Sequence, residues 1–449
     1  MARGAPLQWL DEIRIIDGGF GWEAIRRSKL RIEGHKAWSS LLIKEDPRLV
    51  VDVHKRQIKI SIPAASVSFP AHFSFLHAGC DVICTNTYQA SPSTLASALS
   101  VEIPEARQLM IKAVTLAFDA ISQFEKECDK DTLAKRLTPL VAGSLGPYGA
   151  CLADGSEYTG SYAKDMEFDE LVRFHVQRAT ILHHAGVHFL AWETIPSLIE
   201  VSAIVEAMNR LPDSAIAWVS ILTKDGYTTA HGEPLHQVAS ILRDCEKIFA
   251  VGVNCHVRHD CIPIALATLG DLDIPPDPND DNYHPNPLQV RSVPKCNPPA
   301  RPRPKLLFAY PSSGEVLVRK RKRVRRKRKM VDFWVWPEDS GPDRWASTVA
   351  EYAVSQQMLR QQPGLTAFQI SHSRGLAQWI GGCCRVTPGN ISDLAMRLKP
   401  EVMAHRIQCP TTSVVVGDNI GTTEMQQAPE MKQAMQKRGG KRKNKRKCR

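Results

Sequence analysis

The chain has 449 residues, of which 43% are hydrophobic and 23% charged, and its formal net charge is +11. This composition is that of a globular protein, and the length suits one large α/β barrel with appendages or two to three ordinary domains. No apolar run approaches the roughly 20 residues that cross a bilayer, so we expect no membrane partner. The first residues lack an apolar core of signal-peptide length, and the chain has twelve cysteines. We therefore expect a reducing compartment, the cytoplasm.

The basic residues are concentrated in two tracts. Residues 319–329 hold 10 Lys or Arg, and residues 437–449 hold 9. Removing these 19 charges from +11 leaves −8 for the rest of the chain, so the folded body is mildly acidic. A nucleic-acid-binding face on that body is not expected. The tracts resemble nuclear localisation signals and polyanion-binding runs, so nucleic acid would bind only through them.

Short apolar segments rich in β-branched residues alternate with amphipathic segments along the chain. Eight are predicted strands: residues 14–19, 80–88, 139–146, 187–194, 216–223, 249–255, 305–310 and 377–383. Between several of them, apolar residues recur at three- and four-residue spacing, as in residues 169–185, 197–209 and 235–247. Eightfold alternation predicts an α/β fold, a (β/α)₈ TIM barrel. A doubly wound open sheet is the alternative, and the polar and small residues after each strand favour the barrel.

Three segments interrupt this pattern, and a tail follows it. Residues 55–71 divide what otherwise reads as one amphipathic helix, and residues 257–304, rich in Pro, Asp and Asn, predict a long loop. Residues 316–376 contain the first basic tract and a predicted helix over 345–360. We expect the barrel to occupy residues 1–400 with these as insertions, and residues 401–449 to form a disordered basic C-terminal tail. The segments at 55–71 and 316–376 also read as translated introns or errors in the gene model.

Three cysteines stand at the ends of two predicted strands. Cys255 ends one apolar run, and Cys383 and Cys384 follow two glycines at the end of another. Three thiolates with an open fourth position describe a catalytic Zn²⁺ site, whereas a structural site is closed by four protein ligands. Each cysteine has a plainer reading as a small buried hydrophobe, and the adjacent pair as a vicinal disulfide or a redox pair, although no Cys-x-x-Cys motif is present.

Eight ordered motifs fall at or beside these predicted strands. They are DGG at 17–19, AGCDVICTNTYQAS at 78–91, VAGSLGPYGA at 141–150, LADGSEY at 152–158, ETIP at 193–196, VGVNC at 251–255, YPSSGE at 310–315 and IGGCCR at 380–385. In these motifs the chain resembles the zinc-dependent homocysteine S-methyltransferases, in the branch that uses S-methylmethionine or S-adenosylmethionine. The resemblance spans residues 14 to about 398, outside the three interruptions.

The resemblance implies an activity that gives methionine. Homocysteine would bind one Zn²⁺ per chain as a thiolate beside Cys255, Cys383 and Cys384, and would take a methyl group from a sulfonium donor. A metal-bound thiol is deprotonated at neutral pH, and a sulfonium is an activated leaving group, so positioning replaces acid–base catalysis.

The resemblance also implies where the substrates bind. Asp17 and Glu193 match acidic residues near the homocysteine amino group, while backbone N–H groups around Gly18 and Gly19 are expected to hold its carboxylate. Asn254 is also expected among the substrate-binding residues, where it would orient the cysteine loop. Its plainer reading is a residue that only forms a turn. Thr85, Asn86 and Gln89 are expected to line the pocket for the methyl donor. Helix capping is the plainer reading of the two carboxylates.

One residue departs from the family pattern. The first motif normally continues with Thr before the Glu, whereas Trp22 precedes Glu23 here. A large indole at this point would narrow the acceptor pocket or change the acceptor. The alternatives to a homocysteine methyltransferase are a methyltransferase for selenocysteine or another thiol, and an inactive barrel that binds polyanions through its basic tracts.

Overall fold

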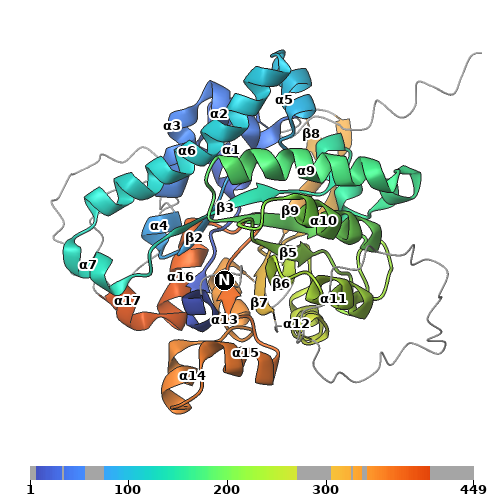
Figure 1. Ribbon diagram of the computed structural model, residues 1–449. Helices are drawn as coiled ribbons and strands as arrows, with labels where there is room; N and C mark the ends of the chain where they lie inside the picture. The colour runs from blue at the N-terminus through green and yellow to red at the C-terminus, as the bar shows by residue number, and fades with distance from the viewer. Residues whose placement is uncertain are drawn as a thin grey trace, which may run out of the picture. The chain divides into compact units, whose positions relative to one another are not determined.

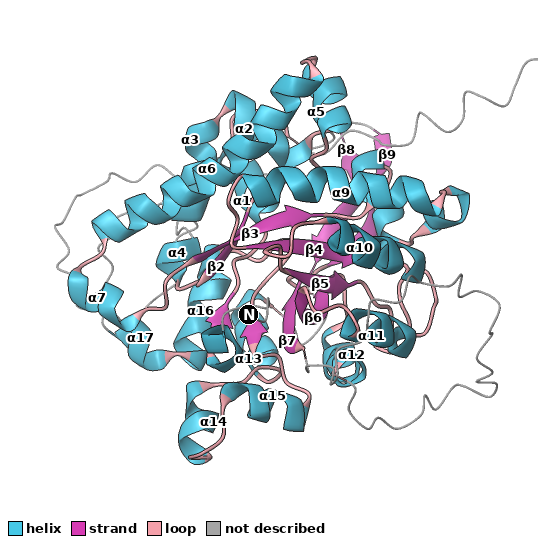
Figure 2. Ribbon diagram, viewed as in Figure 1, coloured by secondary structure: helices cyan, strands magenta, loops and turns pink. Residues whose placement is uncertain are grey.

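The computed structural model describes residues 7–32, 35–55, 75–270, 305–324, 327–335 and 341–404. Eight parallel strands form its main sheet, and Figures 1 and 2 show them at the centre with helices around them. The strands are β1 (Arg14–Ile15), β2 (Val82–Cys84), β3 (Leu140–Leu145), β4 (Phe189–Ile195), β5 (Ala217–Ile221), β6 (Ile248–Cys255), β7 (Leu306–Pro311) and β10 (Trp379–Ile380).

The sheet closes on itself. Its order is β1-β10-β7-β6-β5-β4-β3-β2, and a parallel bridge between Ile16 and Val82 joins the two outer strands. The Asp17 N–H donates to the Val82 carbonyl at 3.0 Å, next to this bridge. The (β/α)₈ barrel predicted from the alternation is therefore confirmed, with all eight strands at the expected places, and the open doubly wound sheet is wrong.

The helices and 3-10 turns follow the strands in chain order. The helices are α1 (Phe20–Arg27), α2 (Leu42–Glu45), α3 (Pro47–Lys55), α4 (Phe75–Ala78), α5 (Pro92–Leu99), α6 (Ile103–Glu127), α7 (Lys130–Lys135), α8 (Tyr148–Leu152), α9 (Phe168–His184), α10 (Leu198–Arg210), α11 (Leu235–Arg243), α12 (Ile262–Leu269), α13 (Pro342–Ala350), α14 (Gln356–Gln361), α15 (Ala367–Arg374), α16 (Pro388–Leu398) and α17 (Pro400–Ala404). The 3-10 turns are η1 (Leu7–Asp11), η2 (Trp38–Leu41), η3 (Ser156–Tyr158), η4 (Ser161–Asp165) and η5 (His259–Cys261).

The barrel interior is packed with aromatic side chains. Phe189, Trp218, Phe249 and Trp379 from four strands lie with ring centroids 4.9–6.3 Å apart, in tilted or edge-on contacts. Trp9 of η1 packs against three of them and so covers one end of this layer. Because each large apolar side chain contributes about 1.5–3 kcal/mol on burial, this layer holds the strand ends at fixed positions.

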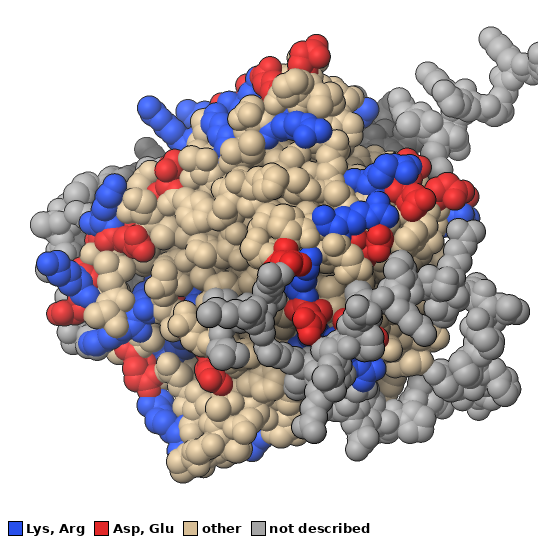
Figure 3. All heavy atoms as spheres, viewed as in Figure 1, with Lys and Arg blue, Asp and Glu red and all other residues tan. Residues whose placement is uncertain are grey.

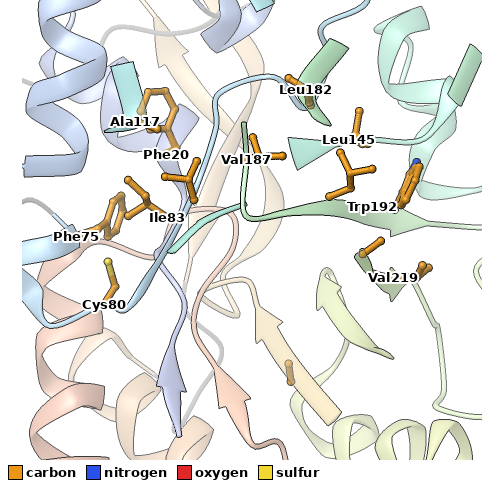
Figure 4. Close-up of a cluster of buried hydrophobic side chains, with 14 of the residues drawn as sticks. Phe20, Phe75, Cys80, Ile83, Ala117, Leu145, Leu182, Val187, Trp192 and Val219 are labelled. Atoms are coloured by element: carbon orange, nitrogen blue, oxygen red, sulfur yellow. The ribbon is translucent and has the colours of Figure 1, made fainter. Parts of the chain in front are cut away.

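A second apolar layer lies between the strands and the helices. Leu145, Trp192 and Val219 stand in register on β3, β4 and β5, and Figure 4 shows them on neighbouring strands. Phe20, at the start of α1, belongs to the same buried cluster. Strands buried on both faces explain why the sequence reads as continuous apolar runs rather than alternating ones.

Two of the predicted interruptions are corrected in part. Residues 262–269 form α12, so the loop expected over 257–304 is wrong there, and residues 271–304 lie outside the described residues. The single helix expected over 345–360 is divided into α13 and α14. Extended backbone separates them, because Ala353 pairs with Ala377 and the Val354 N–H donates to the Ala377 carbonyl at 2.9 Å.

The remaining interruption and the tail lie largely beyond what the structure describes. The segment 55–71 is described only at Lys55, the last residue of α3. The tail begins later than expected, because α17 continues to Ala404, and residues 405–449 lie outside the described residues.

A separate compact unit contains residues 317–335 and the first basic tract. It forms a two-stranded sheet of β8 (Val316–Val324) and β9 (Lys327–Val335), two strands that the sequence pattern did not predict.

Charged side chains of both signs lie on the surface of the described residues. On the face shown in Figure 3, basic and acidic side chains are interspersed. Among the described residues, every helix is too short or too polar to cross a membrane.

Candidate active site

The three predicted cysteine ligands come together at the mouth of the barrel. Cys255 is the last residue of β6, while Cys383 and Cys384 follow β10. The Sγ atom of Cys384 lies 3.6 Å from that of Cys255 and 3.9 Å from that of Cys383, and all three lie within 4.8 Å of one another. No other group of three His, Cys, Asp or Glu in the described part of the chain has metal-ligand geometry.

These spacings fit zinc. Tetrahedral Zn²⁺ with Zn–S bonds of about 2.3 Å places two sulfur ligands about 3.8 Å apart. All three cysteines are free thiols, and 3.9 Å between Cys383 and Cys384 is far beyond a disulfide bond, so the vicinal-disulfide reading is wrong. Hydrogen bonds from the other two thiols lower the pKa of Cys384, as a ligand that binds as thiolate requires. Three sulfurs leave the fourth position of a tetrahedral ion for a substrate.

The backbone around the cysteines is held by the neighbouring strands. Gly382 N–H donates to the Asp17 carbonyl at 3.0 Å, and Cys383 N–H donates to the Pro311 carbonyl at 2.9 Å. A Cβ on Gly381 would lie 2.4 Å from the carbonyl oxygen of Ile16, so only glycine allows β10 to pass this close to β1. The glycines before the cysteine pair therefore let two sulfurs reach the barrel axis.

Asn254 is fully buried and links three strands. Its Oδ1 accepts hydrogen bonds from the Thr194 N–H at 2.9 Å and the Ser220 hydroxyl at 2.6 Å. Its Nδ2 donates to the Thr194 hydroxyl at 2.9 Å. Thr194 and Cys255 both have φ of +62°, a left-handed conformation that costs non-glycine residues energy. These bonds tie the end of β6 to β4 and β5 beside Cys255, and a role of Asn254 in orienting the cysteine loop stays a prediction.

Asp17 and Glu193 are buried carboxylates on β-strand ends beside the cysteines. Asp17 Oδ2 accepts from the Cys84 N–H at 2.9 Å. Glu193 sits where the register of β4 with β5 shifts, a bulge that redirects a side chain, and its Oε1 has no hydrogen-bond partner among the described residues. Burial raises the pKa of Asp17 to about 7. Burial, reinforced by the charge of Asp17, raises the pKa of Glu193 to about 8. No Lys, Arg or His of the described residues pairs with either group, so a bound cation such as an ammonium group would favour their charged forms.

Gly18 and Gly19 lie where the chain passes between other elements. A Cβ on Gly18 would lie 2.6 Å from the Val386 carbonyl oxygen, and one on Gly19 would lie 2.7 Å from that of Cys383. The N–H groups of Gly19 and Phe20 already donate to the carbonyls of Val386 and Gly18. Those two N–H groups are thus engaged within the fold, which differs from the expectation that they hold a carboxylate.

The three residues expected to form a donor pocket divide into two kinds. The Thr85 hydroxyl bonds to the Thr87 hydroxyl at 2.7 Å and accepts from the Ser144 N–H at 3.0 Å, so it joins β2 to β3. Asn86 Oδ1 and Gln89 Oε1 are buried and have no partner in the described chain. Asn86 and Gln89 thus keep free acceptors, whereas Thr85 is occupied by the fold.

Four residues near the cysteines were not predicted as site residues: Trp22, Arg385, Glu157 and Tyr158. Trp22 lies near the cysteine cluster: after the other two thiols and His256, its indole contributes to lowering the pKa of Cys384, and the Arg385 guanidinium lies 5.0 Å from the centroid of its ring. Arg385 also pairs with Glu315, and its φ is +64°. The sequence signalled Trp22 only as a departure from the family pattern. Glu157 and Tyr158, in the segment between β3 and α9, interact electrostatically with Cys384. Both lie in the motif at 152–158 and had no predicted role.

Comparisons with known proteins agree with this geometry. The family model described as Homocysteine S-methyltransferase matches residues 14–398. The chain is 30% identical over 390 residues to Homocysteine S-methyltransferase 1 of Brassica oleracea var. italica, covering 86% of this chain and 93% of that protein. It is 28% identical over 394 residues to Selenocysteine Se-methyltransferase of the same plant, covering 86% and 88%.

A solved structure shows the same likeness. The metallated form of the homocysteine methyltransferase MmuM from Escherichia coli superposes with a TM-score of 0.58 at 26% identity, covering 86% of this chain and 98% of that one. The model match, the relatives and the cysteine cluster agree, and the chain belongs to the homocysteine S-methyltransferase family.

Proposed function

We propose that this protein transfers a methyl group from a sulfonium donor, S-methylmethionine or S-adenosylmethionine, to the sulfur of homocysteine, giving methionine. One observation carries the proposal: three cysteine sulfurs at zinc spacing lie near two buried carboxylates that no Lys, Arg or His of the described residues neutralises. This arrangement suits a ligand with a thiol at one end and an ammonium group at the other.

Zinc, when bound, would hold the acceptor sulfur at the open position and keep it deprotonated at neutral pH. The chain itself supplies position. Asp17 and Glu193 would accept charge-assisted hydrogen bonds from the ammonium, and the acceptor would then be fixed at two points. An acceptor held in this way attacks in line, which can contribute several kcal/mol of the barrier reduction by orientation alone.

The transfer needs no side chain as acid or base. The C–S bond of the sulfonium breaks, its electron pair stays on the donor sulfur, and the methyl carbon forms a bond to the acceptor sulfur. The donor becomes a neutral thioether, and the proton of the acceptor thiol is lost on binding rather than in the transfer step. Asp17 and Glu193 would therefore act by binding, and Asn254 by tying the end of β6, next to Cys255, to Thr194 and Ser220.

The test is zinc content together with methionine formation, in the wild type, Cys384→Ser and Cys128→Ser. Cys128, at the end of α6, is a matched control outside the site. We expect about one zinc per chain and turnover of homocysteine with S-methylmethionine in the wild type and the control, with both lost in Cys384→Ser. Zinc without turnover would contradict the proposed substrates. An active Cys384→Ser protein with full zinc would contradict the proposed site.

Selenocysteine is the second candidate acceptor, favoured by the similarity to a protein named for that activity. It is one methylene shorter than homocysteine, and a single methylene in a binding pocket is worth about 1–3 kcal/mol. Comparing kcat/KM for the two acceptors with one donor decides between them. A ratio above about 10 in favour of homocysteine supports the proposal, and the reverse ratio identifies the alternative.

A further inference from the structure

The segment between β3 and α9 carries Glu157 and Tyr158, which both interact electrostatically with Cys384. It contains α8, η3 and η4, and a buried carboxylate, Glu200 of α10, anchors both of its ends. Glu200 accepts from the Tyr148 N–H at 2.7 Å and from the Tyr162 hydroxyl, and His175 bonds to it at 3.1 Å. These three contacts to one buried residue hold the two ends of the segment that contains η3, which carries Glu157 and Tyr158.

Glu157 is a buried carboxylate with an unused oxygen. Only 6% of the residue is exposed, and its Oε2 has no hydrogen-bond partner among the described residues. No Lys, Arg or His in the described ranges forms an ion pair with it. Burial raises the pKa of Glu157, and the charges of Asp154 and Cys384 raise it further, so a cation beside the carboxylate would favour its charged form. An acidic group held in this way has the electrostatics of a cation site.

Two tyrosines, Tyr158 and Tyr88, interact electrostatically with both Glu157 and Cys255. The Tyr158 ring lies edge-on to His256, the residue after Cys255, with centroids 5.0 Å apart. Tyr88 is buried beside Thr194, and its loop is fixed by Arg178, which donates to the Tyr88 carbonyl at 2.7 Å. Aromatic faces attract cations that carry methyl groups in place of N–H or O–H donors.

We propose that Glu157 and the ring of Tyr158 form the subsite for the positive charge of the methyl donor, on the solvent side of the three cysteines. This inference rests on the proposed function and extends it from the acceptor to the donor. A sulfonium is a permanent cation without a proton to lose, so it cannot be neutralised on burial as an ammonium can. A buried carboxylate without a partner and an aromatic face meet both of its needs: opposite charge and an apolar contact.

The chemistry predicts how this subsite affects the rate. The sulfonium charge disappears as the C–S bond breaks, so attraction to Glu157 is stronger for the bound donor than for the transition state. Such an interaction lowers KM without raising kcat. Loss of the carboxylate should therefore raise the KM for the donor and leave kcat unchanged or slightly higher. A residue that only supported the fold would lower kcat and the zinc content as well.

The experiment compares Glu157→Gln with Glu167→Gln, an exposed carboxylate at the end of the same segment. S-methylmethionine is titrated by calorimetry into the zinc-loaded full chain with methionine saturating the acceptor site, and donor KM and kcat are measured on the same samples. We expect Glu157→Gln to weaken donor binding about tenfold, the size of one charge-assisted contact, while Glu167→Gln matches the wild type. Equal donor affinity in Glu157→Gln and the wild type, or no donor binding by the wild type, would overturn the inference.

The outcomes separate this inference from the proposed function. Weaker donor binding in Glu157→Gln without methionine formation by the wild type would support the subsite and contradict the proposed reaction. Turnover with unchanged donor affinity would do the opposite. If Glu157→Gln does not fold, Tyr158→Leu replaces it, because Tyr158 is 38% exposed and tolerates truncation. We expect a loss of donor affinity of several-fold there, and an unchanged affinity would overturn the inference.

Discussion

The cysteine cluster and the carboxylate pair lie at the same barrel mouth but are built in opposite ways. The cysteines are held by backbone hydrogen bonds to neighbouring strands, and the three Sγ atoms already stand at metal spacing. Asp17 and Glu193 are also fixed by strand ends, yet no Lys, Arg or His of the described residues pairs with their buried carboxylates. The three Sγ atoms already have the spacing that a metal needs, whereas Asp17 and Glu193 need a cation to stabilise their charged forms.

This difference indicates how the two regions contribute to function. Geometry set by backbone contacts fails when the backbone moves, and its failure should cost metal. A buried carboxylate charge without a neutralising partner destabilises the folded protein. A cationic ligand that neutralises this charge removes that free-energy cost, and its affinity increases by the same amount. Changes in the first region should therefore lower stability and zinc binding together. Changes in the second should raise stability and lower substrate binding.

The largest effect is expected from Gly381→Ala. The new Cβ would lie 2.4 Å from the Ile16 carbonyl oxygen, and a backbone atom cannot rotate away, so β10 and the cysteine pair must shift. We expect a loss of stability of about 1–3 kcal/mol and of zinc affinity of about 100-fold. Denaturant unfolding and a competitive zinc titration measure the two.

Gly341→Ala is the matched control for this change. Its Cβ would meet no atom within 4 Å and its φ is 173°, so an alanine should change stability by less than about 0.5 kcal/mol. Full zinc occupancy in Gly381→Ala would show that the close approach of β10 to β1 does not position the ligands.

The second effect is expected from Asp17→Asn, which keeps the acceptor for the Cys84 N–H and removes the charge. The pKa of Asp17 is about 7 in the folded protein, above its ordinary 3.8, so the folded state binds a proton more tightly than the unfolded state does. Wild-type stability should therefore fall as pH rises from about 4 to 7, by up to about 4 kcal/mol for roughly three pKa units.

Asp17→Asn should remove that fall. We expect the variant to be more stable than the wild type at pH 8, equal to it near pH 4, and about 10- to 100-fold weaker in homocysteine binding. Urea unfolding at both pH values and calorimetry with homocysteine provide the measurements. A variant less stable than the wild type at pH 8 would show that the buried charge is already compensated.

A smaller effect is expected in the pH dependence of ligand affinity. An ammonium ligand binds best when Asp17 and Glu193 are both charged, and their pKa values of about 7 and 8 mean that protons are released on binding near neutrality. With methionine as a ligand that has no titrating sulfur, affinity should rise about tenfold from pH 7 to 8, more steeply below pH 7 where two protons are released, and level off above pH 8. Calorimetry in buffers of different ionisation enthalpy counts the protons. Affinity independent of pH in this range would contradict the shared-cation interpretation.

The sequence predicted those parts of the site that depend on local pattern. Cys255, Cys383 and Cys384 were identifiable because each ends a continuous apolar run, and strand ends meet at one face of a barrel. α12 was mistaken for loop because the Pro-rich composition that follows it masked a short apolar helix with proline in its first turn. The helix over 345–360 was divided by a strand-like pairing of Ala353 with Ala377, which no helical periodicity reveals.

The missed residues depend on contacts between distant parts of the chain. Glu157 reaches the cysteines only because η3 is anchored through Tyr162 to Glu200, and a run of two 3-10 turns has no periodicity to predict its position. The engagement of the Gly19 N–H with Val386 likewise joins residues far apart in sequence. Motif matching therefore located the residues, whereas their roles required the tertiary contacts.

Trp22 gives the smallest expected effect and bears on both regions. The Arg385 guanidinium lies over the Trp22 ring, and Arg385 pairs with Glu315. The Trp22 indole also lies near Cys384, so Trp22 bounds the site beside the zinc ligands. Trp22→Thr, the residue usual in the family, would remove that boundary and leave the ligands in place. We expect full zinc content, a few-fold change in homocysteine kcat/KM and a ratio of selenocysteine to homocysteine turnover that shifts by about 10-fold or less, the worth of about one methylene of fit.

Trp22→Phe keeps the ring and should hold the ratio nearer the wild type. A shift in zinc affinity without a shift in that ratio would place Trp22 with the backbone-held metal region. A shift in the ratio alone would make it a determinant of the acceptor.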